Sequence, residues 1–228
     1  MTNLNDLIRP DRYPRSSRYD PAWLLDLDMG PNPLWLLEDL ARDLDLRPGM
    51  RILDLGSGKG ATSVFLAREY DAQVVAADLW IAPEDAAIVF TEAGVGDQVQ
   101  AVRAEAHALP FEKESFDAIV SVDAFEYFGT ADSYLPYLVR FLRPGGQLGM
   151  ATPAMTREVR DLGAIPPHIK KVVGWEATAW HTGPRRHRST PTAPNTTASP
   201  PTSRIRDRSM KTLPGGTDGT RAGLAARR

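Results

Sequence analysis

The sequence predicts an α/β fold with a doubly wound, mostly parallel sheet that carries helices on both faces. An apolar run at 51–55 leads into the glycine turn GSGKG, and the helix-compatible stretch ATSVFLAREY follows at once. A second apolar run at 74–77 ends in the acid Asp78. A strand, a glycine turn, a helix and an acid-ended strand are the units with which parallel sheets build a nucleoside pocket.

The same alternation continues along the chain. Near-continuous apolar runs favour strands that are covered by helices on both faces of the sheet. The turns RPG at 47–49 and RPGG at 143–146 each stop a helix and begin a strand. Expected strands lie at 51–55, 73–77, 98–102, 117–121 and 146–151, and expected helices at 33–45, 60–69, 83–93 and 131–142.

The glycine turn is compatible with three classes of ligand. A mononucleotide phosphate loop requires G-x-x-x-x-G-K, but Leu53 stands where its first glycine belongs. Gly56, Gly58 and Ala61 satisfy the G-x-G-x-x-A form of a dinucleotide loop. The glycines by themselves therefore leave NAD and NADP open, and with them an oxidoreductase.

Asp54 favours the third class of ligand, a cation. An anionic side chain just before the turn is poorly placed beside a pyrophosphate, whose charge the helix N-terminus would receive. S-adenosylmethionine carries an ammonium and a sulfonium and no phosphate, so it suits this position best. Two simpler interpretations stay open, in which Asp54 is a solvated acid at a strand end and Asp78 caps the following turn.

Five elements within residues 51–153 resemble the class I S-adenosylmethionine-dependent methyltransferases. They are the DLGSGKG turn, the acid that ends the second strand, EAHALPF at 105–111, FDAI at 116–119 and LRPGG at 142–146. The order and the spacing are those of the family, and the flanks MGPNPLWLLEDL and IPPHIK resemble a bacterial subgroup of uncertain substrate. The resemblance implies a Rossmann-like methyltransferase sheet and a small-molecule acceptor.

The resemblance also implies a role for each matched residue. The residues implied at the methionine end of the cofactor are Asp54, Gly56, Ser57 and Gly58, with Ser121 at the end of the fourth strand near the reactive methyl. Those implied at the adenosine end are Asp78 for the ribose hydroxyls, Leu79 against the adenine, Glu105 as acceptor from the adenine amino group and Ala106 through its backbone amide.

The catalytic groups are less well defined than the cofactor site. A sulfonium is a good leaving group, so positioning can supply most of the rate of an in-line methyl transfer. A general base is needed only where the acceptor keeps a proton. The run FEYF at 125–128 departs from the many relatives that carry histidine there. The candidates for a base are Asp123, Glu126, Tyr127 and His181. The rings of Phe125, Tyr127 and Trp35 are candidates for contact with the sulfonium, with core packing as the alternative.

Composition excludes several other kinds of site. The chain has no cysteine, which excludes disulfides, thiolate metal sites and a cysteine nucleophile. The histidines at 107, 168, 181 and 187 show no metal-ligand spacing. There is no apolar run of about 18 residues that would span a membrane, and charges stand where a signal peptide needs an apolar block. The expectation is a cytoplasmic protein without a metal.

Three regions are expected: a cover over the cofactor at 1–32, a methyltransferase domain at 33–180, and a disordered tail at 181–228. The tail holds 10 of the 27 basic and 2 of the 29 acidic residues, so its net charge is +8 and that of the remainder is −10. The acidic domain offers no groove for nucleic acid. The oligomeric state cannot be predicted.

The tail also departs from the family pattern. It is rich in Thr, Pro and Arg and poor in large apolar residues, which predicts disorder. A class I methyltransferase continues past its fifth strand with a helix and an antiparallel strand pair, and this pattern stops near His181. We therefore expect the strand pair to be missing. The hypothesis is a reading-frame shift, which leaves a truncated, non-catalytic remnant as one possibility. A genuine basic arm is the alternative.

Overall fold

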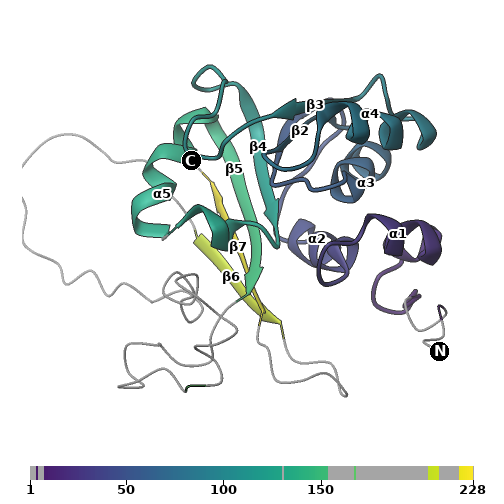
Figure 1. The fold of residues 1–228 in the computed structure, drawn as a ribbon. Coiled ribbons are helices and arrows are strands. Elements are labelled where there is room, and N and C mark those ends of the chain that lie inside the picture. Colours follow the sequence, from purple (N-terminus) through teal and green to yellow (C-terminus); the bar gives the residue numbers. More distant parts are fainter. Residues whose placement is uncertain are drawn as a thin grey trace, which may run out of the picture.

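The computed structural model describes residues 8–129 and 131–153, the single positions 4 and 167, and the backbone of 205–210 and 221–227. Within these residues seven strands form one sheet in the order β3-β2-β1-β4-β5-β7-β6 (Figure 1). The strands are β1 (Arg51–Leu55), β2 (Gln73–Asp78), β3 (Val99–Arg103), β4 (Phe116–Val122), β5 (Leu142–Pro153), β6 (Ile205–Met210) and β7 (Arg221–Arg227).

The first five strands run parallel, so their carboxyl ends meet at one edge of the sheet. The strand β1 lies between β2 and β4, and Asp54 is in register with Ala76 on one side and Val120 on the other. The chain winds outward from β1 to β3 and then back to β4. This reversal creates the crevice in which open α/β sheets bind their ligands.

Helices cover both faces of the sheet, as the sequence predicts (Figure 1). The helices α2, α3 and α4 lie on one face, and α5 lies on the other with the 3₁₀ turns η3 and η4. None of the helices in the described part of the chain is long and apolar enough to cross a membrane. The helical elements are η2 (Ser16–Arg18), α1 (Pro21–Leu27), α2 (Pro33–Ala41), α3 (Ala61–Tyr70), α4 (Pro83–Glu92), η3 (Phe125–Phe128), α5 (Ala131–Leu138) and η4 (Val139–Phe141).

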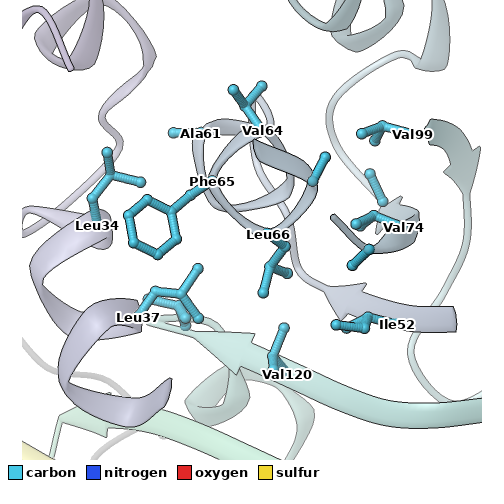
Figure 2. Packing of buried hydrophobic residues seen from close by; sticks show 14 of the residues in the cluster. Leu34, Leu37, Ile52, Ala61, Val64, Phe65, Leu66, Val74, Val99 and Val120 are labelled. Atoms are coloured by element: carbon cyan, nitrogen blue, oxygen red, sulfur yellow. The ribbon is translucent and has the colours of Figure 1, made fainter. Parts of the chain in front are cut away.

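Alternation along β1 divides the core into two layers. Ile52 points into the layer formed with α2 and α3, where Figure 2 shows Phe65 beside Leu34 and Leu37. Leu53 points into the opposite layer, toward α5. Full burial of each large apolar side chain contributes about 1.5–3 kcal/mol, so both layers hold the sheet rigid beneath its carboxyl edge.

Helix α2 begins sharply and ends earlier than its apolar pattern predicts. The Asn32 side chain accepts hydrogen bonds from the amides of Leu34 and Trp35, each at 3.1 Å, and Pro33 takes the first helical position. The expected helix 33–45 ends at Ala41. Past that residue the amides donate to carbonyls three residues back, which tightens the chain out of the α-helical form.

The C-terminal strands correct an expectation from the sequence. The backbone of β7 pairs antiparallel with β5 from Gln147 to Pro153, and β6 pairs antiparallel with β7. The described backbone thus places a strand pair at this edge, where the sequence analysis expects none. The expected disorder of the tail stays a prediction. Without β7, the outer edge of β5 would expose unpaired amides and carbonyls, and pairing with this edge needs only main-chain atoms. The rest of 181–228 lies outside the described residues.

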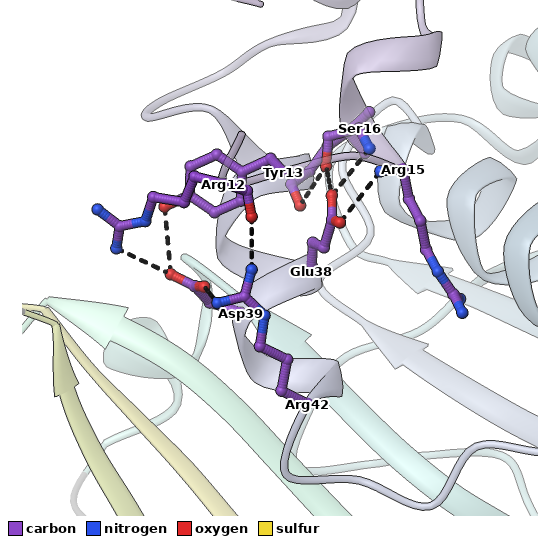
Figure 3. A network of polar contacts seen from close by, with 8 residues as sticks. Arg12, Tyr13, Arg15, Ser16, Glu38, Asp39 and Arg42 are labelled. Atoms are coloured by element: carbon purple, nitrogen blue, oxygen red, sulfur yellow. Dashed lines mark hydrogen bonds and ion pairs between the residues drawn. The ribbon is translucent and has the colours of Figure 1, made fainter. Parts of the chain in front are cut away.

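The N-terminal segment is fixed to α2 by a buried carboxylate (Figure 3). Glu38 accepts hydrogen bonds from the amides of Arg15 at 3.1 Å and Ser16 at 2.8 Å, and its side chain is almost fully buried. Asp39 accepts a hydrogen bond from the Tyr13 hydroxyl at 3.2 Å and also pairs with Arg12. These contacts anchor the chain that leads to α1 and to the edge of the sheet.

Replacing Glu38 by alanine should lower the free energy of unfolding by about 1–3 kcal/mol, because the buried Ser16 amide and the half-buried Arg15 amide lose their acceptor. Glu38→Gln keeps one acceptor oxygen and should cost less. Urea denaturation followed by circular dichroism measures both changes. An alanine variant as stable as the wild type would contradict the anchoring role.

Candidate cofactor site

A cavity of about 240 Å³ opens at the carboxyl edge of the parallel strands. Its lining comes from the segments that follow β1, β2, β3 and β4, and from the N-terminal segment between α1 and α2. The lining residues are 27–31, 33, 55–59, 61, 62, 77–80, 104–107, 122–124, 127 and 128. The position is the one at which the reversal of strand order predicts a ligand.

The glycine turn forms the floor of this cavity. Gly56, Gly58 and Gly60 have φ values of 75°, 54° and 97°, in the left-handed region that favours glycine. Four of the turn amides have partners within the protein. Those of Gly56 and Ser57 donate to the Ala77 carbonyl, that of Gly58 to Asp78 Oδ2 at 2.9 Å, and that of Gly60 to the Ser57 carbonyl.

Asp54 lies beneath the turn and does not line the cavity. Its Oδ2 accepts hydrogen bonds from the hydroxyls of Thr62 and Ser63 in the first turn of α3, both at 2.6 Å. Its Oδ1 is buried and has no hydrogen-bond partner within the described residues. Burial raises the pKa of Asp54 to about 6, while the two hydroxyls oppose this shift. A buried carboxylate with an unused oxygen fits a nearby cation.

Asp78 connects the glycine turn to the loop after β2. Its Oδ2 accepts from the Gly58 amide, and its Oδ1 accepts from the amides of Trp80 at 2.8 Å and Ile81 at 3.0 Å. The side chain thus caps the following turn, as one of the two interpretations of the sequence predicted. The same carboxylate also lines the cavity, so it is in place to accept hydroxyl groups.

Glu105 and Ala106 border the cavity after β3. The Glu105 carboxylate accepts from the His107 amide at 3.0 Å and lies 2.9 Å from His107 Nδ1. The side-chain contact with His107 holds the pKa of Glu105 below its ordinary value. The sequence analysis did not predict His107 as a site residue. Its position two residues after Glu105 in the EAHALPF segment is the feature that could have indicated it.

The predicted cofactor residues converge on this cavity with two exceptions. Those that line it are Gly56, Ser57, Gly58, Asp78, Leu79, Glu105 and Ala106. Asp54 lies beneath the floor. Ser121 is fully buried in β4, and its hydroxyl has no hydrogen-bond partner among the described residues.

The four catalytic candidates are not equivalent in position. Asp123 and Tyr127 line the cavity after β4. Asp123 also has a φ of 54°, a strained value for a residue with a side chain. Glu126 is buried outside the lining and accepts a hydrogen bond from Thr152 Oγ1 at 2.7 Å. His181 lies outside the described residues.

Part of the expected N-terminal cover reaches the cavity. Residues 27–31 line it, and Lys59 Nζ, from the glycine turn, donates to the Asp26 carbonyl at 2.7 Å. The aromatic residues of the segment pack elsewhere: Tyr19 is in the core and Tyr13 stacks on Trp35 with 5.0 Å between ring centroids. Neither Trp35 nor Phe125 lines the cavity, so both rings serve packing.

Two exposed rings stand at the margin of the cavity. Trp80, after β2, meets Tyr127, in η3, edge to face with 5.6 Å between ring centroids. Both side chains line the cavity and are about half exposed or more, at 66% and 49%. Trp80 follows β2 and Tyr127 follows β4, and β1 lies between these two strands in the sheet. The pair of rings therefore spans the carboxyl end of β1.

Fold and site together define an α/β protein with a nucleoside-type pocket at the reversal of its sheet. The profile of a family described as "Methyltransferase domain" matches residues 52–146. The demethylmenaquinone methyltransferase of Clavibacter sepedonicus is 35% identical over 173 residues, which cover 72% of this chain and 68% of that protein. That of Thermus thermophilus is 37% identical over 133 residues, which cover 58% and 59%. The chain spans half or less of the length of several other curated relatives.

Solved structures agree with these sequence relatives. An S-adenosylmethionine-dependent methyltransferase from Thiobacillus denitrificans, in complex with S-adenosyl-L-homocysteine, is 25% identical, with a TM-score of 0.52 over 64% of this chain and 58% of that chain. The chain belongs to the class I S-adenosylmethionine-dependent methyltransferases, which confirms the resemblance carried by residues 51–153. Its cofactor is S-adenosylmethionine.

Proposed function

We propose that this chain transfers the methyl group of S-adenosylmethionine to a small-molecule acceptor in the cytoplasm. The observation that carries the proposal is the glycine turn, in which four amides are occupied within the protein and two carboxylates, Asp54 and Asp78, lie alongside. A pyrophosphate needs free amides and an environment without negative charge. The amides of Gly56, Ser57, Gly58 and Gly60 are not free, and the Asp78 carboxylate accepts from one of them. The turn therefore argues against the NAD(P)-dependent oxidoreductase that the glycine spacing had left open.

The proposed roles follow the positions of the side chains. At the methionine end Gly56, Ser57 and Gly58 form the floor, and the buried charge of Asp54 lies beneath it to attract the ammonium. At the adenosine end Asp78 accepts from the ribose hydroxyls, and Leu79 packs against the adenine. Glu105 accepts from the adenine amino group.

The chemistry that the cofactor supplies is a methyl group on a good leaving group. The protein then has three tasks, which are to bind, to orient and to exclude water. Residues 27–31 close the cavity from the N-terminal side. Asp123, at the carboxyl end of β4, is the candidate in the lining that can accept a proton from an acceptor hydroxyl or ammonium.

A small acceptor is favoured over a macromolecule by the charge and shape of the site. Asp28, Asp78, Glu105 and Asp123 place four carboxylates in the lining, which disfavours the phosphates of a nucleic acid. The Clavibacter and Thermus relatives are named for demethylmenaquinone, a small molecule. From these relatives we infer that the acceptor is a small molecule, and we do not infer which one.

A thermal melt of the purified chain tests the proposal. S-adenosylhomocysteine at about 100 times its dissociation constant should add roughly 2.7 kcal/mol to the free energy of unfolding. For a domain of this size the melting temperature should then rise by about 5–11 °C. NADP at the same concentration should cause no shift. A shift with NADP alone would refute the proposed cofactor site.

Asp78→Ala should weaken binding of S-adenosylhomocysteine by about 1.5–3 kcal/mol, because the ribose hydroxyls lose a charged acceptor. Isothermal titration of the purified variant measures the change. Asp97→Ala, an exposed acid outside the cavity lining, is the matched control and should bind as the wild type does. Unchanged affinity in Asp78→Ala would remove this residue from the site.

A further inference from the structure

His107 joins two segments that border the cavity. Its Nδ1 lies 2.9 Å from Glu105 Oε1, and its Nε2 lies 2.9 Å from the carbonyl oxygen of Phe128. The first contact is on the segment after β3, and the second is at the end of η3, after β4. The strands β2 and β1 lie between β3 and β4, so the connection crosses the carboxyl edge where the cavity opens.

Both contacts of the imidazole are with hydrogen-bond acceptors. A neutral imidazole has one N–H and one lone pair, so it can satisfy only one of the two contacts. An imidazolium has two N–H groups and can donate to the carboxylate and to the carbonyl at the same time. The imidazolium is therefore the form of His107 that can make both contacts at once.

We propose that His107, as an imidazolium, positions the Glu105 carboxylate for the adenine amino group and secures η3 beside the adenosine end of the cavity. This inference rests on the proposed function, in which Glu105 binds the adenine. Each carboxylate oxygen has two lone-pair sites. His107 occupies one site on each oxygen, with its ring on Oε1 and its amide on Oε2, and the Ala108 amide also contacts the carboxylate, so at least one of the four sites stays available.

Two ionisable side chains, Tyr134 and Glu105, lie beside the imidazole of His107. Tyr134 on α5 meets the imidazole edge to face, with 5.1 Å between ring centroids, and its hydroxyl donates to the Ala106 carbonyl at 2.7 Å. Burial raises the pKa of Tyr134 well above its ordinary value, so it stays neutral. Glu105 is thus the charged side chain that the structure gives to this imidazole, and protonation turns a hydrogen bond into an ion pair.

The inference predicts a pH dependence of cofactor binding. The neutral imidazole can make only one of the two contacts, so we expect the wild type to bind S-adenosylhomocysteine more tightly in acid than in base. Asp54 acts in the opposite direction, because its pKa is raised to about 6 and its ionisation favours an ammonium. The contribution of His107 is therefore the difference between two chains measured at the same pH.

Isothermal titration with S-adenosylhomocysteine measures this difference in the full chain. His107→Gln keeps a donor but cannot take a charge, and Lys113→Gln removes one positive charge from an exposed turn outside the cavity. At about pH 5.5 we expect His107→Gln to bind about fivefold more weakly than the wild type, a value suited to an exposed ion pair. At about pH 8.5 the two should converge, and Lys113→Gln should follow the wild type throughout.

A second ligand separates positioning from a general effect on the fold. S-inosylhomocysteine lacks the 6-amino group that Glu105 is proposed to accept. The wild type should prefer the adenosyl compound, and His107→Ala should lose most of this preference. A purely structural role would weaken both ligands alike and at every pH.

The outcomes distinguish this inference from the proposed function. If the wild type binds S-adenosylhomocysteine and His107→Gln binds it equally well at every pH, the role of His107 alone is overturned. Failure of the folded wild type to bind S-adenosylhomocysteine would overturn the cofactor site and this role together. Loss of affinity at low pH together with loss of base preference supports the positioning role.

Discussion

Replacing Gly60 by alanine should lower the free energy of unfolding by about 2–5 kcal/mol, the largest stability effect that we expect. Gly60 caps the N-terminus of α3 with a φ of 97°, where a side chain costs about 1–2 kcal/mol. A Cβ atom built there would also lie 2.3 Å from Cε1 of Phe90, a ring that is 1% exposed. The ring cannot retreat without opening the layer between α3 and α4.

Gly94→Ala is the control that isolates the steric part of this effect. Gly94 also has a positive φ, 69°, but nothing lies within 4 Å of a Cβ atom built there. Its substitution should cost only the backbone term of about 1–2 kcal/mol. Urea denaturation of both variants gives the comparison. Equal losses would mean that Phe90 accommodates the methyl group, and that the third glycine serves the turn and not the packing of α3 against α4.

The parallel half of the fold could be predicted because each of its elements has a local cause. Each of the strands β1 to β4 begins and ends within one residue of its expected range. The strand β5 extends beyond its expected range at both ends, from Leu142 to Pro153. Apolar runs, proline and glycine turns, and a capping residue such as Asn32 are all readable from neighbouring positions. Local patterns predicted two helices that are too long. Helix α2 ends at Ala41, and α5 ends at Leu138, where the chain tightens into η4.

Features that join distant segments could not be predicted in the same way. The pairing of β7 with β5 depends on free main-chain groups at a sheet edge, which composition does not encode. The bridge from His107 to the Phe128 carbonyl joins residues 21 positions apart, and the contact of Trp80 with Tyr127 depends on which strands are neighbours. The motif located Asp54 correctly in β1, but its place beneath the floor follows from how α3 packs on the strand.

Replacing Asp54 by asparagine should make the protein more stable at neutral pH and weaken cofactor binding. Burial raises the pKa of Asp54 from 3.8 to about 6, so the folded protein holds this proton more tightly than the unfolded chain does. The contribution of Asp54 to stability is therefore fully present below about pH 4 and is lost as the pH rises through about 6. A shift of about two pKa units corresponds to about 3 kcal/mol.

The asparagine variant does not carry this charge, and its side-chain oxygen can still accept from Thr62 and Ser63. Its free energy of unfolding should exceed that of the wild type by up to about 3 kcal/mol at pH 7.5, and the two should converge near pH 4. Asp97→Asn, at an exposed acid in the turn before β3, is the matched control and should follow the wild type. Urea denaturation across this pH range measures the three curves.

The same substitution should weaken binding of S-adenosylhomocysteine, because the ammonium loses a negative charge beneath the floor of the cavity. Stability and affinity should thus move in opposite directions at one residue, which is expected where a buried charge is kept for a ligand. A variant that is more stable and binds normally would mean that the charge of Asp54 does not serve the cofactor. A variant that is less stable at every pH would contradict the gain in stability expected from removing the buried charge.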